Sequence, residues 1–468
     1  MKRRHFLTSS SAMFGAAGAL SQLPTRRAFA QSEAPLTRLS MPPLLDTRAT
    51  GRLALTTSAG STSFLGGPTT STAGFNQDYL GPTIVVQNGE LAAEVKNTLG
   101  DPISAHWHGL LVPGEHDGGP HLPIATGETW RPEIAIAQDP ATVWYHSHIH
   151  EQTAEQVYFG LAGVIHVTDG QDDARGLPSS YGIDDLTLVL QDRRFDAAGR
   201  MVYSPSRMDV MHGFSGNRML VNGQAGATAV VPNGITRLRL LNGSNARIYT
   251  LFFDDARPMH LVATDGGFLP APVALDTLRL APGERAEILV DFSGGDAPIL
   301  MSDPGQSYGI VQFATDTTLP TRIVRLPEQL DGVLEDLSGA EVNTRQVSLD
   351  MGMGGMMRGG GFAINGRPFD MRRIDFEVAL GSVERWHVRS TMLAHPFHVH
   401  GVRFRVVSEN GAPPRPENIG WKDTVLVPGE ADLLARFDQP ASRETPFMFH
   451  CHILEHEDAG MMGQFTVT

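Results

Sequence analysis

Four pairs of histidines, each pair with one residue between its members, lie in two groups that are far apart in this chain. They are His106 and His108, His146 and His148, His398 and His400, and His450 and His452. Residues i and i+2 of a β-strand face the same side, so each pair is expected to point two imidazoles into one cavity. Imidazole is a ligand that suits copper, and eight imidazoles could share three copper ions. The fold must therefore bring two distant parts of the chain together.

The single cysteine, Cys451, stands between the two histidines of the last pair and so faces the opposite side of a strand. His456 and Met461 follow it at i+5 and i+10, and His395 lies just before the third pair. Two histidines, one thiolate and a weak axial thioether form the ligand set of a blue copper electron-transfer centre. The peptide links around Cys451 would join that centre directly to the eight-histidine cluster.

The first 30 residues have the pattern of an export signal. A twin-arginine pair, Arg3 and Arg4, precedes a mild apolar stretch, and residues 28–30 (Ala-Phe-Ala) form a small-x-small cleavage site. This pattern is typical of the twin-arginine route, so we expect a periplasmic protein. An exported protein with one cysteine cannot form an internal disulfide, and a free thiol is a liability in an oxidising compartment. A metal is the natural partner for Cys451.

Charge and hydropathy exclude two classes of partner. Loss of residues 1–30 removes five basic residues and no acidic ones, which changes the net charge from −14 to −19. An acidic surface repels nucleic acid and anionic lipid, so we expect no nucleic-acid partner. The mature sequence has no run of apolar residues long enough for a transmembrane helix, so we expect no membrane span.

The pattern of the mature chain predicts an all-β protein. Short apolar runs bounded by Gly, Pro and Asn recur about every ten residues, as at 83–86, 186–190 and 237–241, and this spacing is typical of sandwiches and barrels. Weak repeats at 81–90, 220–224 and 363–367 indicate three related sandwiches.

Polar and proline-containing stretches near 170–178 and 315–343 mark the boundaries between the predicted domains. We therefore predict a signal at 1–30 and domains at 40–170, 178–318 and 343–468. The first and third domains hold the histidine pairs, and the second is predicted to be a spacer that positions them.

The chain resembles a known family. The four motifs, and residues 450–461 (HCHILEHEDAGM) above all, are similar to those of the three-domain bacterial multicopper oxidases, the group that includes laccases and copper-efflux oxidases. The resemblance covers nearly all of the mature chain. It implies three cupredoxin-like Greek-key β-sandwich domains and four coppers per chain, one of type 1, one of type 2 and two of type 3.

The resemblance also implies a role for each motif residue. The type 1 ligands would be His395, Cys451, His456 and Met461. The type 2 ligands would be His106 and His398. The type 3 ligands would be His108, His146 and His452 for one copper and His148, His400 and His450 for the other. Two family acids near the cluster correspond to Asp117 and Glu457, which would relay the protons needed to make water.

The resemblance implies that dioxygen is the electron acceptor and that the chain works as a monomer. Its reductant is open. Copper-efflux oxidases bind cuprous ion through aspartate and methionine, and residues 389–394 keep Met392 but lack the aspartate. We therefore favour a laccase-like enzyme that oxidises phenols, aromatic amines or low-valent metal ions. A cuprous oxidase in periplasmic copper tolerance is the alternative.

Two other classes of function compete with an oxidase. A copper-free scaffold is one, because a twin-arginine-exported relative of the family supports cell division without metals; that relative lacks the copper ligands, which this chain keeps. A copper nitrite reductase is the other, but such enzymes usually have two domains per chain. The segment from Met351 to Met357 fits a docking site for soft cations or a flexible connector equally well.

Overall fold

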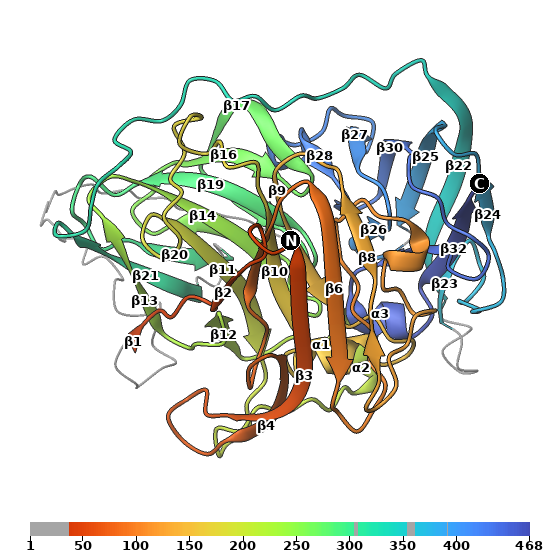
Figure 1. The fold of residues 1–468 in the computed structure, drawn as a ribbon, viewed down its shortest axis with the longest axis horizontal. Coiled ribbons are helices and arrows are strands. Elements are labelled where there is room, and N and C mark those ends of the chain that lie inside the picture. The colour runs from red at the N-terminus through yellow and green to blue at the C-terminus, as the bar shows by residue number, and fades with distance from the viewer. Residues whose placement is uncertain (1–36, 304–307, 353–360, 391) are drawn as a thin grey trace, which may run out of the picture.

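The protein is built from six β-sheets that pack in pairs as three sandwiches (Figure 1). The computed structural model describes residues 37–303, 308–352, 361–390 and 392–468. The predicted signal at 1–30 and residues 353–357 of the methionine-rich segment lie outside the described residues. The all-β prediction is confirmed, and each sandwich encloses its own core of buried aliphatic and aromatic side chains.

The first sandwich packs a four-stranded sheet against a five-stranded sheet. The four-stranded sheet has the order β2 (Leu44–Asp46), β5 (Thr83–Val86), β10 (Ala162–Val167) and β9 (Ala141–His146). The other sheet has the order β4 (Thr70–Phe75), β3 (Arg52–Thr62), β6 (Gly89–Asn97) and β7 (Thr129–Trp130), with β8 (Glu133–Ile136) also paired to β6. Strand β6 alternates buried and exposed residues, as expected of a sheet with one face in water. Strands β9 and β10 are buried along their whole length.

The middle sandwich consists of two six-stranded sheets. One sheet has the order β1 (Thr37–Arg38), β13 (Ala227–Pro232), β21 (Tyr308–Asp316), β20 (Ile299–Ser302), β15 (Tyr249–Phe253) and β18 (Leu278–Leu280). The other has the order β12 (Arg218–Val221), β11 (Asp185–Arg193), β14 (Ile235–Asn242), β19 (Arg285–Asp291), β16 (Met259–Thr264) and β17 (Gly267–Leu275). Strands β11 and β14 are buried throughout, because this sheet lies against the first sandwich.

The third sandwich pairs a six-stranded sheet with a five-stranded sheet. The larger sheet has the order β23 (Phe362–Ile364), β22 (Glu341–Met351), β25 (Val383–Ser390), β30 (Glu430–Arg436), β27 (Phe404–Glu409) and β28 (Trp421–Lys422). The smaller has the order β24 (Phe376–Val378), β32 (Met462–Val467), β31 (Phe447–Cys451), β26 (His395–Val399) and β29 (Thr424–Val427). In Figure 1 this blue sandwich lies on the right and the green middle sandwich on the left.

Helices are few and short in the described residues. They are α1 (Thr153–Tyr158), α2 (Arg207–His212) and α3 (Leu454–Asp458), with 3-10 turns at Gly114–His116 and Pro416–Asn418. The carboxylate of Asp458 at the end of α3 accepts hydrogen bonds from the backbone N–H groups of Thr153 (3.0 Å) and Ala154 (2.9 Å) at the start of α1. This contact fixes the ligand-bearing end of the third sandwich to the first. Within the described part of the chain, no helix has the length and apolar character needed to cross a membrane.

Two of the predicted repeats form the same turn. Asn222-Gly223 and Asn365-Gly366 both adopt positive φ angles at the two central positions, and Asn-Gly is the preferred sequence for such a tight hairpin turn. The domain boundaries themselves stay a prediction, although, apart from β1 in the middle sandwich, the strands of the three sandwiches separate between β10 and β11 and between β21 and β22.

Candidate metal centres

Three of the four predicted histidine pairs lie where a strand ends. His146, His398 and His450 belong to β9, β26 and β31, whereas the second member of each of these pairs lies beyond its strand. His106 forms only an isolated bridge, to His146, and the equivalent pairing in the third sandwich joins His398 to His450. The expectation that both members of a pair lie within one strand is therefore wrong.

The consequence of that expectation holds nevertheless. The two imidazole rings of each pair lie with their centroids 4.9–5.7 Å apart, so they face the same side. Because the second histidine of these pairs lies beyond the end of its strand, its ring can turn toward the facing sandwich.

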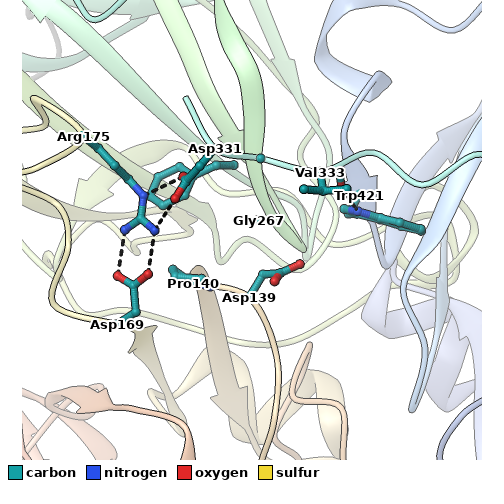
Figure 2. A pocket seen from close by; sticks show the side chains of 10 residues that line it. Asp139, Pro140, Asp169, Arg175, Gly267, Asp331, Val333 and Trp421 are labelled. Carbon is teal, nitrogen blue, oxygen red and sulfur yellow. Dashed lines mark hydrogen bonds and ion pairs between the residues drawn. The ribbon is translucent and has the colours of Figure 1, made fainter. Parts of the chain in front are cut away.

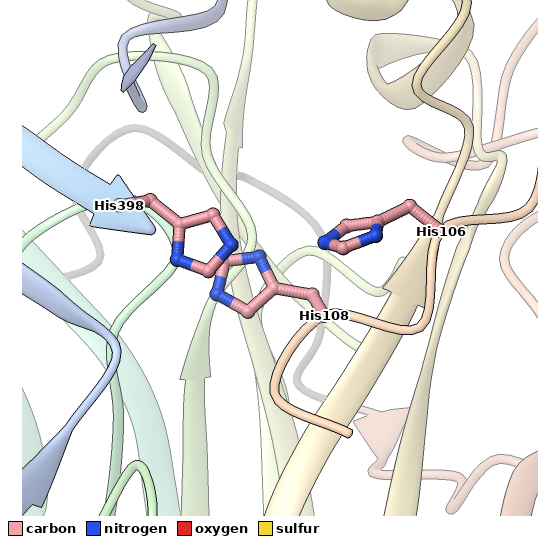
Figure 3. A group of neighbouring side chains, drawn as sticks. All are labelled: His106, His108 and His398. Atoms are coloured by element: carbon pink, nitrogen blue, oxygen red, sulfur yellow. The ribbon is translucent and has the colours of Figure 1, made fainter. Parts of the chain in front are cut away.

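Stacked rings join the two sandwiches. His106 stacks on His400 with 3.8 Å between ring centroids, and His108 stacks on His398 at 3.7 Å. Figure 3 shows His108 lying against His398, with His106 beside them. Both stacks pair a residue before position 110 with one after position 397, so the fold brings together the two groups that the sequence separates.

The ring nitrogens of the cluster lack protons where they face one another. His106 and His146 each direct Nδ1–H to a backbone carbonyl, at 2.9 and 2.8 Å, so their Nε2 atoms carry bare lone pairs. His400 directs Nδ1–H to the Asp117 carboxylate, and His450 directs Nδ1–H to the backbone oxygen of Cys451. Their Nε2 atoms therefore both lack a proton, although they lie only 3.2 Å apart. An imidazole whose other nitrogen is held in this way is oriented as a metal ligand.

Buried ring nitrogens without a hydrogen-bond partner complete this pattern. Among the described residues these atoms include His106 Nε2, His108 Nδ1, His146 Nε2, His398 Nε2 and both nitrogens of His452. A buried polar atom without a hydrogen-bond partner lowers the folding stability, and a cation bound between the rings would give these nitrogens a partner. The donor set, six or more neutral imidazoles, suits copper, so the residues present fit the metal.

Burial favours the neutral form of six imidazoles of the cluster. It lowers the pKa of His398 to about 4. It also lowers the pKa of each of His108, His146, His148, His400 and His452 well below the ordinary value. Neutral imidazole is the form that binds a metal.

Three groups of convergent ligand atoms contain the residues predicted for the type 2 and type 3 coppers, and the group with the two predicted type 2 ligands also includes His108. They are His106 with His108 and His398; His108 with His146 and His452; and His148 with His400 and His450, and in each the ligand atoms lie within 4.8 Å of one another. The assignment of these residues to particular copper ions stays a prediction.

Cys451 lies in a separate, buried group with His395 and His456. The Sγ atom is 3.3 Å from His395 Nδ1 and 3.6 Å from His456 Nδ1. His456 directs Nε2–H to the backbone oxygen of Met211 (3.2 Å) and so presents a bare Nδ1 to the sulfur. Burial raises the pKa of the Cys451 thiol and lowers that of His395 to about 4 and that of His456 to about 3. A thiol with a raised pKa becomes a thiolate only beside a cation.

Met461 is fully buried in the same core as Cys451, and its backbone oxygen accepts the N–H of Cys451 at 3.1 Å. Its role as an axial ligand stays a prediction. Met392, in contrast, is 58% exposed.

The two predicted acids both face the cluster. Asp117 Oδ2 lies 2.8 Å from His400 Nδ1 and 3.3 Å from His106 Nδ1. Glu457 lies 3.4 Å from His148 Nδ1 through Oε1 and 3.1 Å from His450 Nδ1 through Oε2. Each carboxylate therefore bridges two histidines. In both cases one histidine belongs to the first sandwich and the other to the third.

Sequence reasoning missed a third acid at the cluster. Asp423 Oδ1 lies 3.0 Å from His108 Nε2, and the backbone oxygen of Asp423 accepts Nδ1–H of His398 at 2.8 Å. Asp423 follows β28 at a position with no histidine nearby in sequence, so no local spacing could have identified it.

A surface cavity of about 210 Å³ lies apart from the histidines, where the three sandwiches and their connections meet (Figure 2). Arg175 bridges Asp169 and Asp331 on one side of it, through N–O distances of 2.6 Å. On the other side Asp139 pairs with Arg403, which lies over the Trp421 ring. The charges around this cavity pair with one another, which fits a junction between connections.

Comparison with known proteins supports this geometry. Three family models, each described as multicopper oxidase, match residues 56–172, 144–319 and 342–468. Among solved structures, a laccase-like multicopper oxidase CueO from Ochrobactrum sp. is 44% identical, with a TM-score of 0.89 over 92% of this chain and 100% of that chain. The McoA multicopper oxidase of Aquifex aeolicus is 30% identical, with a TM-score of 0.83 over 93% and 100% of the two chains.

Curated relatives bear a different kind of name. Proteins called cell division protein FtsP are 38% identical in Yersinia pestis, over 99% of this chain and 98% of theirs, and 37% identical in Escherichia coli K12, over 100% and 99%.

Proposed function

This chain belongs to the multicopper oxidase family, and we propose that it is a laccase-like enzyme that oxidises phenols, aromatic amines or low-valent metal ions. Dioxygen is the electron acceptor and is reduced to water. One observation carries this proposal: eight buried imidazoles converge with bare nitrogens, one residue away from a buried cysteine that faces two further imidazoles.

The same residues would hold the metal. The cysteine group, with Met461, would hold one copper, and the eight-histidine cluster would hold three. Bound copper supplies one-electron exchange at the cysteine and four-electron reduction of dioxygen at the cluster. The metal count and the type of each ion belong to this proposal.

The chain's own residues connect the two sites. Cys451 is flanked by His450 and His452, so one peptide unit on each side separates the sulfur-bearing residue from two residues of the cluster. All three side chains are buried. This covalent link supports direct passage of electrons from an outer substrate to the cluster, and the burial excludes water from that route.

The two acids hold the cluster in shape. Asp117 accepts Nδ1–H of His106 with its backbone oxygen and Nδ1–H of His400 with its carboxylate, and the Glu457 carboxylate lies 3.4 Å from Nδ1 of His148 and 3.1 Å from Nδ1 of His450. Such partners fix the tautomer of a ligating histidine. The proton relay predicted for both acids stays a prediction.

The choice of reductant rests on a relative. The Ochrobactrum protein is described as having oxidase activity towards lignin model compounds and lignosulfonate, which supports a phenolic substrate here. Cuprous oxidation remains the alternative, and the exposed Met392 is the residue of this region that could serve it. The relatives also support an exported, periplasmic protein, and the twin-arginine route and the monomeric state are part of the proposal.

The test is to purify the mature chain with copper, count the metal and follow dioxygen with an electrode. We expect about four coppers per chain, a blue colour, and dioxygen uptake with a phenol but without release of peroxide. Comparing turnover of the phenol with turnover of cuprous ion, under the same conditions, decides between the two reductants. Stimulation of phenol oxidation by added copper would favour cuprous oxidation.

A role in cell division is the second candidate, because the FtsP relatives match this chain over nearly its whole length. A copper-loaded chain that stays colourless and consumes no dioxygen would favour this role over an oxidase. Complementation of a strain that lacks its FtsP, by the wild type and by Cys451→Ser alike, would then show a role that does not need the metal.

A further inference from the structure

We propose that Arg285 of the middle sandwich is a positioning residue for the histidine cluster, acting through Asp423 on His108 and His398. This inference rests on the proposed copper-binding function, and it concerns a residue that lies outside all four histidine motifs.

Arg285 makes contacts with all three sandwiches at once. Its Nε donates to the oxygen of Thr142 in the first sandwich (3.2 Å), and its Nη1 and Nη2 donate to the oxygens of Gly283 (2.9 Å) and Asp265 (3.2 Å) in the middle sandwich. The same two nitrogens hold both carboxylate oxygens of Asp423 in the third sandwich, at 2.7 and 2.5 Å. A guanidinium has five N–H donors, and here every one has an acceptor.

The Asp423 carboxylate passes this constraint to the cluster. Its Oδ1, held by Arg285, lies 3.0 Å from His108 Nε2 and 2.9 Å from the hydroxyl of Thr424. His108 therefore keeps its proton on Nε2 and turns a bare Nδ1 to the metal position. The backbone oxygen of Asp423 holds the ring of His398, which stacks on that of His108. Asp423 thus holds two rings from different sandwiches, that of His108 through its carboxylate and that of His398 through its backbone oxygen.

A second layer of buried charge holds this pair in place. Asp265 accepts the backbone N–H of Arg285 (2.7 Å) and pairs with the ammonium group of Lys422 (3.1 Å), which also pairs with Glu284 (3.0 Å). All of these groups are buried. Removing one partner from such a network leaves a buried charge without compensation, so the network resists any shift of Arg285.

The packing around the network leaves no spare space. Gly109, the last residue of the first histidine motif, has φ +91°, and a Cβ atom there would lie 2.7 Å from Arg285 Nη2 and 2.8 Å from Asp423 Oδ2. A Cβ atom on Gly283 would lie 2.8 Å from the ring of His452. The turn that precedes β19 therefore packs directly against the cluster. Gly109 is needed because a side chain at that position would overlap the guanidinium of Arg285.

Lysine could not replace Arg285. Its ammonium group has three donors on a flexible stem, whereas the planar guanidinium matches a carboxylate in two-point contact and reaches three further acceptors. The middle sandwich therefore does more than separate its neighbours, because it provides the residue that fixes how their histidines meet.

The test uses full-length protein and titrates copper against a competing chelator in the wild type, Arg285→Lys and Arg285→Met. Partners that orient ligating residues typically change metal affinity about 10- to 100-fold. We expect a loss of that size at the histidine cluster, seen in metal counts and in the near-ultraviolet absorption of the two predicted type 3 coppers. The blue absorption of the cysteine site should stay unchanged.

The matched control is Arg193→Lys, since Arg193 is equally buried, also joins the first and middle sandwiches through Tyr79 and Val157, and touches no cluster histidine. It should leave both absorptions as they are. If Arg285→Met does not fold, Arg285→Lys decides. Copper affinity within about twofold of the wild type in a folded Arg285 variant, or equal loss in the Arg193 variant, overturns the inference. A wild type that binds no copper contradicts the proposed function instead.

Discussion

The buried carboxylate of Glu287 gives a quantitative prediction about acid stability. Its Oε2 accepts Nε–H of Arg237 at 2.7 Å, and its Oε1 accepts from Arg239 at 3.2 Å and from Thr142 at 2.6 Å. Burial alone would raise the pKa of Glu287, but the guanidinium groups of Arg237 and Arg239 overcome that effect and hold it at about 2, below the ordinary 4.5. This network joins the first sandwich to the middle one.

The lowered pKa of Glu287 corresponds to about 3 kcal/mol of folding stability. The unfolded carboxyl takes up its proton at a higher pH than the folded one. The contribution is therefore fully present above about pH 4.5 and is lost as the pH falls towards 2, with about 2 kcal/mol gone by pH 3.

The assay is urea unfolding of the copper-free protein, followed by circular dichroism from pH 7 to pH 3, in the wild type and in Glu287→Gln. At pH 7 we expect the variant to be less stable by about 3–5 kcal/mol, because Arg237 and Arg239 lose the buried carboxylate between them and keep only Asp172 and Asp185 as acidic partners. The gap should narrow by about 2 kcal/mol at pH 3, since only the wild type has a carboxylate to lose. Two parallel profiles, with a constant gap at every pH, would refute this reasoning.

Four further outcomes are expected. Cys451→Ser should abolish the blue colour and phenol oxidation and lower the metal count from about four to about three per chain, while circular dichroism stays unchanged; a blue variant would contradict the cysteine site. Asp117→Asn should slow dioxygen uptake about 10- to 100-fold, because an amide can hold His400 in the wrong tautomer; an unchanged rate in the oxygen electrode would remove Asp117 from the site. Gly109→Ala should cost about 2–4 kcal/mol in urea unfolding, from the strain of positive φ and the close approach to Arg285, and a stable variant would show that the neighbours can yield. Removal of copper by a chelator should lower the melting temperature and bleach the protein, and added copper should restore both; a melting curve that does not move would mean that the metal does not bind the folded chain.

The histidine cluster could be predicted because its signal is local. Spacing of i and i+2 requires only an extended backbone, and the structure keeps the rings of every pair together even where the strand has already ended. The same reasoning placed Cys451 on the opposite side, where its sulfur faces His395 and His456. The three sandwiches followed from short strands at regular spacing, a pattern that is also local.

What the sequence did not reveal depends on contacts between distant residues. Arg285 and Asp423 are 138 positions apart, and an arginine at the start of a strand or an aspartate after one has many ordinary explanations. Asp117 and Glu457 were identified from the resemblance to the family, since spacing alone does not distinguish an acid at the cluster from a turn residue. The one local trace of the buried charges is Gly109, whose lack of a side chain has meaning only once the guanidinium beside it is known.

The stacking of rings between the first and third sandwiches has a consequence for biosynthesis. Half of the eight imidazoles precede residue 150 and the other half follow residue 397. A chain that is still being synthesised therefore has at most an incomplete set of histidine ligands for a metal ion. Assembly of the complete cluster therefore has to wait until the last histidine pair has been made, and a stop codon at position 450 would leave a chain without His450, Cys451 and His452.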